Sequence, residues 1–260
     1  MLVIAAAVLA LASPSVPLVA AGDVGSCGST GDEATARLLD RLPGTIALLG
    51  DSVYERGSAD EFRRCFSWAR HKPRIRPAVG NHEYLTPGAR GYFDYFRVRP
   101  WYSYERGAWH VVALNSNCGP AGGCGADSPQ AHWLRADLAA HPSRCTLAYA
   151  HHPRFSSGLH GSDRTLASLW RILAAGGVDV YLAGHDHHYE RFAPLSGIRQ
   201  FVVGTGGRSL YPVLRRLSGS RTAQSSTYGV LALSLRPDGY SWRFVPVSGS
   251  YRDAGSAACR

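Results

Sequence analysis

The chain has 260 residues, 45% of them hydrophobic and 18% charged, which excludes a wholly disordered chain and suits one domain with a sizeable core. Its formal net charge of +9 would attract anionic partners, but the basic residues, nearly all Arg, are scattered and form none of the runs typical of nucleic-acid-binding surfaces. We therefore expect one globular unit without a specific nucleic-acid partner.

The first predicted element is a leader. Residues 2–12 form an apolar run, and Ala10-Leu11-Ala12 matches the small-x-small pattern of a signal-peptidase site. The run is too short to span a bilayer as a helix of the mature protein. We expect residues 1–12 to be a signal peptide, the protein to be secreted to an extracellular or periplasmic space, and the mature chain to have no membrane span. A buried first strand is the alternative.

After the leader, short apolar runs typical of buried strands alternate with amphipathic segments, the pattern of an α/β domain. Strands are predicted at 17–22, 45–49, 76–79, 109–115, 145–150 and 178–183, and helices at 32–42, from 127 onward and at 162–175. From residue 198 the pattern is strand and turn, with a strand at 199–203, a Gly-rich turn at 204–207 and a hairpin at 228–235 and 240–247. We assign residues 17–248 to one domain and 249–260 to a C-terminal tail.

Six cysteines form an even set that suits an oxidising compartment. Cys118 and Cys124 flank a Gly-rich segment, which a disulfide could close into a small loop. If they pair, four cysteines remain, and the pairings Cys27 with Cys65 and Cys145 with Cys259 are then possible by elimination only. A zinc-binding cysteine cluster is the weaker alternative, because no Cys-x-x-Cys spacing occurs.

Polar clusters follow five of the predicted strands at the point where each strand ends. Ligand sites in open α/β sheets gather outside the carboxyl ends of strands, so these clusters can converge in space. They offer carboxylates, an amide, imidazoles and a phenol without a thiolate, a donor set suited to Zn, Fe or Mn. The clusters are Asp23-Val24-Gly25, Gly50-Asp51-Ser52-Val53-Tyr54, Gly80-Asn81-His82-Glu83, His151-His152-Pro153 and Gly184-His185-Asp186-His187.

The five motifs, in this order, resemble those of the calcineurin-like metallophosphoesterases, and more narrowly of the purple acid phosphatase branch. Two features are those of the branch, namely Asp-x-Gly at residues 23–25 and Gly-Asp-x-x-Tyr at residues 50–54. The likeness runs from residue 19 to residue 247. It implies an α/β fold, the four-layer αββα metallophosphoesterase sandwich of two mixed sheets flanked by helices, with residues 17–248 as the catalytic domain. We expect the late hairpin in the second sheet.

The resemblance also implies two metal ions that share one carboxylate. A phenol of pKa about 10 ionises at ordinary pH only beside a strong Lewis acid, so the tyrosine ligand argues for Fe(III) at the first position. The second ion would be divalent, with Zn, Fe and Mn all open. The implied ligands are Asp23, Asp51, Tyr54 and His187 for the first ion, and Asp51, Asn81, His151 and His185 for the second.

The implied reaction is hydrolysis of phosphate monoesters, in small phosphorylated substrates, by hydroxide bound to the two metals. The resemblance places His82 to protonate the leaving alkoxide or to stabilise the transition state, and Glu83 could orient it. His160 falls where plant-like members carry the first of two substrate-facing histidines, but the second is Gly161 here.

Other polar residues near the motifs are assigned supporting roles. Glu190 and Arg191 complete a Gly-His-x-His-x-Tyr-Glu-Arg run typical of the branch, and we expect them to form a structural network that supports the ligands. His152, Asp186 and His188 are interpreted as supporting or solvent-facing. No role is assigned to the remaining four histidines, His71, His110, His132 and His141.

Three alternative functions stay open. A phosphodiesterase or nucleotide hydrolase would use the same metal centre, because the sequence does not define the substrate walls. A catalytically silent metal-binding surface protein is the alternative from a different class. A basic nucleic-acid binder would need salt-sensitive affinity for DNA or RNA and gains no support from the motifs.

Overall fold

The structure, a computed structural model, describes residues 15–260, so the predicted signal peptide at residues 1–12 lies outside the described residues. Five α-helices occur in the described part of the chain, joined by short 3-10 helices. The α-helices are α1 (Gly31–Arg41), α2 (Ala59–Cys65), α3 (Arg90–Phe96), α4 (Pro129–Ala140) and α5 (Ala167–Ala175), and the 3-10 helices are η1 (Ser67–Arg74), η2 (Glu83–Leu85), η3 (Pro87–Ala89) and η4 (Arg164–Leu166).

The strands form two mixed sheets and a small parallel pair. The six-stranded sheet has the order β15 (Ala254–Ala258), β14 (Gly239–Pro246), β13 (Gly229–Arg236), β1 (Val16–Ala21), β3 (Thr45–Leu49) and β5 (Ile75–Ala78). The seven-stranded sheet has the order β12 (Ser220–Gln224), β10 (Tyr189–Phe192), β11 (Arg199–Val203), β9 (Val180–Ala183), β8 (Cys145–Tyr149), β7 (Trp109–Ala113) and β6 (Tyr102–Arg106). The pair is β2 (Gly25–Ser26) with β4 (Val53–Tyr54).

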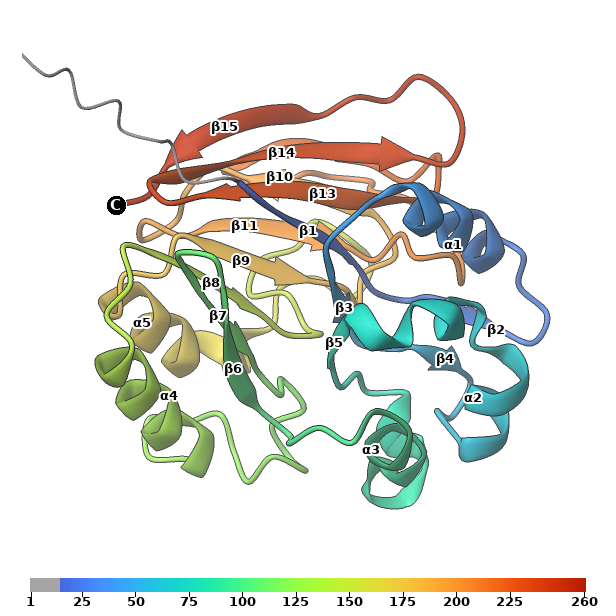
Figure 1. Ribbon diagram of the computed structural model, residues 1–260, viewed down its shortest axis with the longest axis horizontal. Helices are drawn as coiled ribbons and strands as arrows, with labels where there is room; N and C mark the ends of the chain where they lie inside the picture. Colours follow the sequence, from blue (N-terminus) through green and yellow to red (C-terminus); the bar gives the residue numbers. More distant parts are fainter. Residues whose placement is uncertain (1–14) are drawn as a thin grey trace, which may run out of the picture.

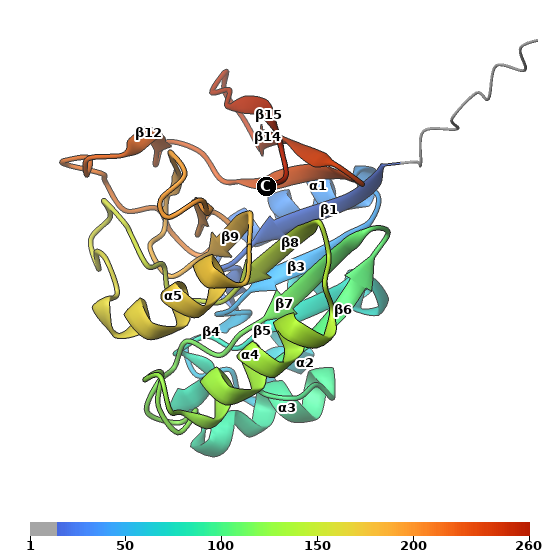
Figure 2. The same ribbon diagram turned by 90° about the vertical axis from the view of Figure 1, so that its left-hand side faces the viewer.

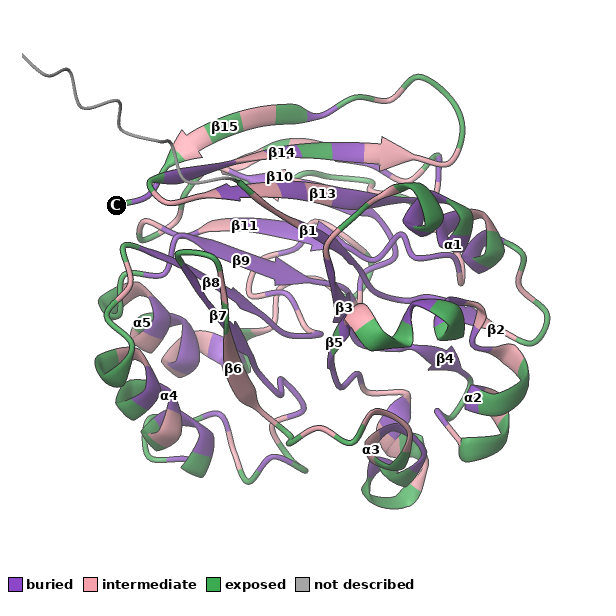
Figure 3. Cartoon of the chain, viewed as in Figure 1, coloured by how far each residue is buried: buried purple, intermediate pink, exposed green. Residues whose placement is uncertain are grey.

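The two sheets lie between two groups of helices. Helices α4 and α5 lie on one side of the molecule, and α1, α2 and α3 lie on the other (Figures 1 and 2). Side chains alternate along the central strands: Leu147 joins the larger core, which both sheets share, whereas Ala148 joins the core beneath α4 and α5. The central strands are therefore buried on both faces (Figure 3), which explains why they form continuous apolar runs in the sequence.

The six predicted buried strands are present as β1, β3, β5, β7, β8 and β9, each within two residues of the predicted bounds. The prediction that the late hairpin belongs to the second sheet is wrong. Strand β13 pairs antiparallel with β1, with Leu233 opposite Leu18. The hairpin therefore belongs to the six-stranded sheet, which contains the first strand of the chain. The residue pattern of a hairpin specifies its strands and turn, but not the sheet edge to which it adds.

The C-terminal segment at residues 249–260 is also more ordered than a tail. Residues Ala254–Ala258 form β15, which pairs antiparallel with β14 and places Gly255 opposite Trp242. A Cβ atom at Gly255 would lie 2.5 Å from the Trp242 ring, so only a residue without a side chain fits there. Alanine, glycine and serine have low β propensity, so this strand has no signature in the sequence.

Three disulfides join the six cysteines in the three pairs that the sequence indicated as possible. Cys118–Cys124 closes the small Gly-rich loop, and Cys27–Cys65 links the loop before α1 to the end of α2. Cys145–Cys259 connects the start of β8 to the residue that follows β15, and it thereby joins the two sheets. Within residues 15–260, no helix has the length and apolar character needed to cross a membrane.

Candidate metal centre

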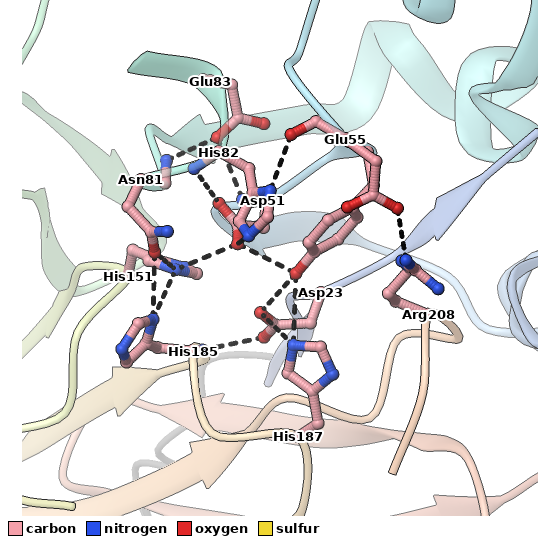
Figure 4. A network of polar contacts seen from close by, with 12 residues as sticks. Asp23, Asp51, Glu55, Asn81, His82, Glu83, His151, His185, His187 and Arg208 are labelled. Atoms are coloured by element: carbon pink, nitrogen blue, oxygen red, sulfur yellow. Dashed lines mark hydrogen bonds and ion pairs between the residues drawn. The ribbon is translucent and has the colours of Figure 1, made fainter. Parts of the chain in front are cut away.

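The polar clusters of the five motifs meet at one end of the two sheets. Strands β1, β3 and β5 run parallel in one sheet, and β8 and β9 run parallel in the other. Because their carboxyl ends lie at the same end of the sandwich, the residues that follow them converge. Figure 4 shows the converging side chains, which come from both sheets and lie mostly buried: Asp23, Asp51, Asn81, His151, His185 and His187.

A first group of donor atoms surrounds the hydroxyl of Tyr54. This oxygen lies 3.0 Å from Asp23 Oδ1, 2.9 Å from Asp51 Oδ2 and 3.2 Å from His187 Nε2. His187 Nε2 is in turn 3.3 Å from Asp23 Oδ1. The four residues predicted to bind the first ion are therefore assembled around one point.

A second group surrounds the amide oxygen of Asn81. Asn81 Oδ1 lies 2.9 Å from His151 Nε2 and 3.0 Å from His185 Nδ1, and these two nitrogens are 3.2 Å apart. His151 Nε2 is also 3.4 Å from Asp51 Oδ2. One oxygen, Asp51 Oδ2, therefore borders both groups.

These distances suit metal coordination. Two ligand atoms, each about 2.1 Å from one ion, lie about 3.0–3.4 Å from each other in right-angled to tetrahedral geometry. The Leu49 carbonyl, an acceptor only, lies 2.8 Å from His151 Nδ1, so that nitrogen carries the proton and Nε2 turns its lone pair toward two acceptor oxygens. Lone pairs that face each other in a buried site require a cation between them, so the residues fit a pair of metal ions.

The pKa values of His151 and Tyr54 lead to the same requirement. Burial lowers the pKa of His151, but the charge of Asp51 outweighs burial and raises that pKa to about 10. Burial, followed by the charges of Asp23 and Asp51, raises the pKa of Tyr54 well above its usual value. Both shifts include the negative charges of Asp23 and Asp51, which a cation at the centre would offset, and an ionised Tyr54 would need a strongly charged cation beside it.

The backbone is strained where it presents these ligands. Asp23, Asp51 and His185 adopt left-handed conformations, with φ of 60°, 48° and 68°. Such conformations cost about 1–3 kcal/mol each for residues other than glycine, and they are characteristic of functional sites.

Two glycines of the motifs allow close packing around these ligands. A Cβ atom on Gly80 would overlap the carboxylate and backbone nitrogen of Asp51, and one on Gly50 would lie 2.5 Å from His151 Nδ1. The Gly-Asp and Gly-Asn pairs of the motifs are therefore explained by space as well as by chemistry.

Glu83 holds the ligand loops together. Its buried carboxylate accepts hydrogen bonds from the backbone N–H groups of Asp51 (3.1 Å), Ser52 (2.6 Å) and Gly80 (2.7 Å). Burial, followed by the nearby charge of Asp51, raises the pKa of Glu83 to about 7. The carboxylate is directed at these amides rather than at His82, so orientation of His82 comes from elsewhere.

His82 is oriented by backbone groups and lies at the open side of the first donor group. Its Nδ1 lies 2.7 Å from the Glu55 carbonyl, and its backbone N–H donates to Asp51 Oδ1 at 3.0 Å. The ring centroid is 4.4 Å from that of Tyr54, and Nε2 is 4.0 Å from Asp51 Oδ2. Because Nδ1 must donate to the carbonyl, Nε2 is the nitrogen that faces the donor groups.

His160 lies beside the second donor group. Its ring centroid is 4.5 Å from that of His185. The loop that carries it is tied to the buried carboxylate of Asp186, which accepts from the backbone N–H groups of His160 (2.8 Å) and Gly161 (3.1 Å). Asp186 is therefore a loop anchor rather than a solvent-facing residue.

The two residues predicted to support the ligands differ in position. Glu190 accepts hydrogen bonds from the backbone and hydroxyl of Ser157 and so fixes the same loop as Asp186. Arg191 instead forms a two-pronged ion pair with Asp253, at 2.8 Å on each prong. Among the described residues, the side-chain hydrogen bonds of Arg191 are with Asp253 alone, so its support of the centre is indirect.

Sequence reasoning missed three residues that follow the Gly-rich turn at 204–207. Ser209 Oγ lies 2.7 Å from His187 Nδ1, and the Tyr211 ring stacks on the His187 ring with centroids 4.2 Å apart. Arg208 donates its backbone N–H to the Asp23 carbonyl at 3.0 Å. The only signal for this segment was the Gly-rich turn itself, which brings the backbone close to the ligand loops.

Two mixed sheets flanked by helices, with buried oxygen and nitrogen donors at their shared carboxyl ends, define an α/β sandwich with a candidate metal centre. The chain belongs to the calcineurin-like phosphoesterase family, whose sequence model matches residues 16–189. The family predicted from the ordered motifs is thereby confirmed.

Relatives of known sequence include acid phosphatases. An uncharacterised protein of Mycobacterium tuberculosis is 29% identical over 199 residues, which cover 63% of this chain and 37% of that protein. Tartrate-resistant acid phosphatase type 5 of Rattus norvegicus is 37% identical over 78 residues, which cover 30% of this chain and 24% of that enzyme. The chain thus spans well under half the length of these relatives. The match to an acid phosphatase confirms the predicted likeness to the purple acid phosphatase branch.

Solved structures confirm the fold. Purple acid phosphatase from yellow lupin (Lupinus luteus) seeds superposes with a TM-score of 0.81 at 19% identity, covering 95% of this chain and 54% of the lupin chain. GAP50, the anchor in the inner membrane complex of Plasmodium, superposes with a TM-score of 0.77 at 14% identity, covering 95% of this chain and 90% of GAP50.

Proposed function

We propose that the chain hydrolyses phosphate monoesters with two metal ions held by the seven predicted ligands. The single observation that carries this proposal is the position of Asp51 Oδ2, which lies 2.9 Å from the Tyr54 hydroxyl of one donor group and 3.4 Å from His151 Nε2 of the other. A shared carboxylate oxygen of this kind suits two ions about 3.5–4 Å apart. Such ions, when bound, neutralise the charge of a phosphate group and make hydroxide available near neutral pH.

The first ion is proposed to be ferric and the second divalent, with Zn, Fe or Mn as candidates. The phenol of Tyr54 borders two carboxylates, Asp23 and Asp51, and is buried. Displacement of its proton in this surrounding calls for a trivalent cation more than a divalent one. The second group has one carboxylate, one amide and two imidazoles, a set that several divalent ions accept.

The side chains at the open side of the centre have distinct roles in this proposal. His82, held through Nδ1 by the Glu55 carbonyl, presents Nε2 to the substrate and, as the imidazolium, gives a proton to the leaving alkoxide. His160, beside His185, contacts the substrate from the other side. The His82 ring is held by a backbone carbonyl, so it is already oriented before substrate binds.

The test uses the purified chain loaded with iron and zinc. We expect it to hydrolyse phenyl phosphate faster than diphenyl phosphate between acidic and neutral pH. The reverse preference would favour the phosphodiesterase alternative, and hydrolysis of neither ester would overturn the proposed function.

A non-catalytic role is the second candidate, because GAP50 has this fold at a TM-score of 0.77 and is described as an anchor. The complete set of seven converging donor residues argues against that role here. His82→Ala discriminates between the two, since a protein that only binds metal has no phosphatase activity for this substitution to remove.

We also propose that the protein is secreted. Three disulfides among the described residues suit an oxidising compartment. Fractionation of cells that express the gene should recover the protein outside the cytoplasm with no free thiols, and recovery of reduced protein in the cytoplasm would contradict secretion.

A further inference from the structure

Arg208 stands at the edge of the first donor group. Its backbone N–H donates to the Asp23 carbonyl at 3.0 Å, and its guanidinium carbon lies 5.2 Å from the centroid of the Tyr54 ring. Figure 4 shows its side chain next to that of Glu55, to which a dashed line joins it. A positive charge therefore lies next to the phenol ring whose oxygen belongs to the metal centre.

Most hydrogen-bonding capacity of Arg208 is unused by the protein. Nη2 donates to Glu55 Oε1, and among the described residues this is the one side-chain hydrogen bond of the guanidinium. The guanidinium has five N–H donors in a fork that matches a carboxylate or phosphate. Since the Arg208 side chain is 31% exposed, a ligand at the centre can reach the remaining donors.

Glu55 is suited to be displaced from Arg208. Its side chain is 58% exposed, and exposed ion pairs of this kind are weak. The backbone carbonyl of Glu55 holds His82, at 2.7 Å from Nδ1, so the carboxylate can move while the carbonyl keeps its role. An anion that approaches the centre beside Tyr54 would compete with the Glu55 carboxylate for the same fork.

We propose that Arg208 binds a second anionic group of the substrate, a carboxylate or a further phosphate close to the phosphate that is cleaved. Glu55 occupies Arg208 when that group is absent. The inference rests on the proposed function and names its preferred substrates, which are phosphate esters whose leaving group carries a negative charge. An uncharged leaving group would leave the Arg208–Glu55 pair intact and gain nothing from it.

Three inert phosphonates test this proposal without any turnover. Methylphosphonate has one anionic group, phosphonoacetate adds a carboxylate, and methylenediphosphonate adds a second phosphonate. Calorimetry on the metal-loaded chain should show that Arg208→Gln weakens binding of at least one of the two-anion ligands by about tenfold, the value of one charge-assisted hydrogen bond. The ligand that is affected more identifies the second group as carboxylate or phosphate.

Glu55→Gln and Arg171→Gln complete the design. Glu55→Gln removes the competing carboxylate, so two-anion ligands should bind several-fold more tightly while methylphosphonate binding stays unchanged. Arg171, exposed on α5, gives the same change in net charge far from the centre, and Arg171→Gln should leave all three affinities unchanged. In steady-state assays, Arg208→Gln should raise KM for salicyl phosphate, whose leaving group carries a carboxylate, without changing kcat. The same variant should leave KM for phenyl phosphate unchanged.

Two results would overturn the role of Arg208. Equal weakening of all three phosphonates by Arg208→Gln would mean that Arg208 only supports the loop at residues 204–211, and no weakening would mean that it contacts no ligand. Either result leaves the proposed function intact if methylphosphonate still binds the wild-type chain. Failure of methylphosphonate to bind the wild-type, metal-loaded chain would instead count against the proposed function and everything that rests on it.

Discussion

His82 is oriented through its backbone and through Nδ1, so its side chain can be removed without moving the ligands. The backbone hydrogen bond to Asp51 persists in His82→Ala. We expect this variant to keep both metals and to lose about 10²–10⁴-fold in kcat for phenyl phosphate, the range of a lost general acid. Metal analysis beside steady-state kinetics checks this, and a variant that retains wild-type kcat would remove His82 from the reaction.

Tyr54 distinguishes an iron-containing phosphatase from the wider family. If its oxygen binds Fe(III), the purified protein is coloured by a tyrosinate-to-iron charge-transfer band, and Tyr54→Phe abolishes that band. The ring stays buried between the same neighbours, so the variant should remain folded. As a control, the circular dichroism spectrum of Tyr54→Phe should match that of the wild type. A colourless, iron-free wild-type enzyme with full activity would show the ferric assignment to be wrong.

At the level of single residues, the sequence predicted which side chains converge better than it predicted their surroundings. The convergence of Asp51, His151 and the other proposed ligands was predictable because each follows a recognisable buried strand within an ordered motif. Arg208 and Tyr211 were not, because they follow a Gly-rich turn whose path depends on contacts with distant residues. Glu83 was assigned to the correct region with the wrong partner, since only the fold brings the N–H group of Ser52 to its carboxylate.

Among the secondary-structure elements, α4 is fastened to the seven-stranded sheet by a buried histidine. His110 on β7 lies between Asp137 Oδ2 of α4, at 2.8 Å from Nε2, and Glu105 Oε1 of β6, at 2.7 Å from Nδ1. Removal of His110 takes one hydrogen-bond partner from the buried Asp137 carboxylate and leaves the Ser103 hydroxyl, at 2.7 Å. We expect His110→Ala to lower the free energy of unfolding by about 3 kcal/mol, measured by urea denaturation.

The matched control for His110 is Glu105→Gln. Glu105 is 54% exposed and touches the same ring, so this substitution should cost less than about 1 kcal/mol. Equal losses in the two variants would show that burial of Asp137 contributes nothing to the role of His110. Neither variant should change kcat, because the side-chain contacts of His110 are with Glu105 and Asp137, and none of these three residues belongs to the proposed metal centre.

The elements that the sequence predicted are those with a strong periodic pattern. Helix α1 and the central strands were found within two residues of their ends, because burial on one or both faces sets their apolar spacing. Strand β15 and the short helices α2 and α3 were missed. Their order depends on tertiary contacts, such as Gly255 against Trp242 and the stacked rings of Phe62 and Tyr95 with centroids 4.7 Å apart, and these contacts join residues distant in sequence.

For the whole molecule, the proposed metal centre requires that the two sheets keep their relative position, since residues from both sheets converge there. Asp253, just before β15 of one sheet, accepts from Tyr189 (2.6 Å) and Arg191 (2.8 Å) on β10 of the other. This buried junction is a second tie between the sheets beside the Cys145–Cys259 disulfide. Its strength should depend on pH, because it contains a carboxylate.

Burial raises the pKa of Asp253, but hydrogen bonds from Arg191 and Tyr189 outweigh burial, so the net pKa lies below its usual value. A carboxyl group with a lowered pKa in the folded state stabilises the fold above its unfolded-state pKa, and it loses this contribution as pH falls through the folded-state value. We therefore expect Asp253→Asn to be less stable than wild type at pH 7 by about 2–3 kcal/mol. The difference should persist down to about pH 5 and shrink below about pH 4.

Urea unfolding of both proteins across pH 3–7 measures this difference. Both must be stripped of metal with a chelator, because protonation of the metal ligands would otherwise add its own pH dependence. The other carboxylates titrate alike in the two proteins, so the difference between their unfolding free energies isolates Asp253. A difference that stays constant from pH 7 to pH 3 would mean that the Asp253 charge contributes nothing to the tie between the sheets, and that shape and hydrogen bonding alone hold the ligand loops in register.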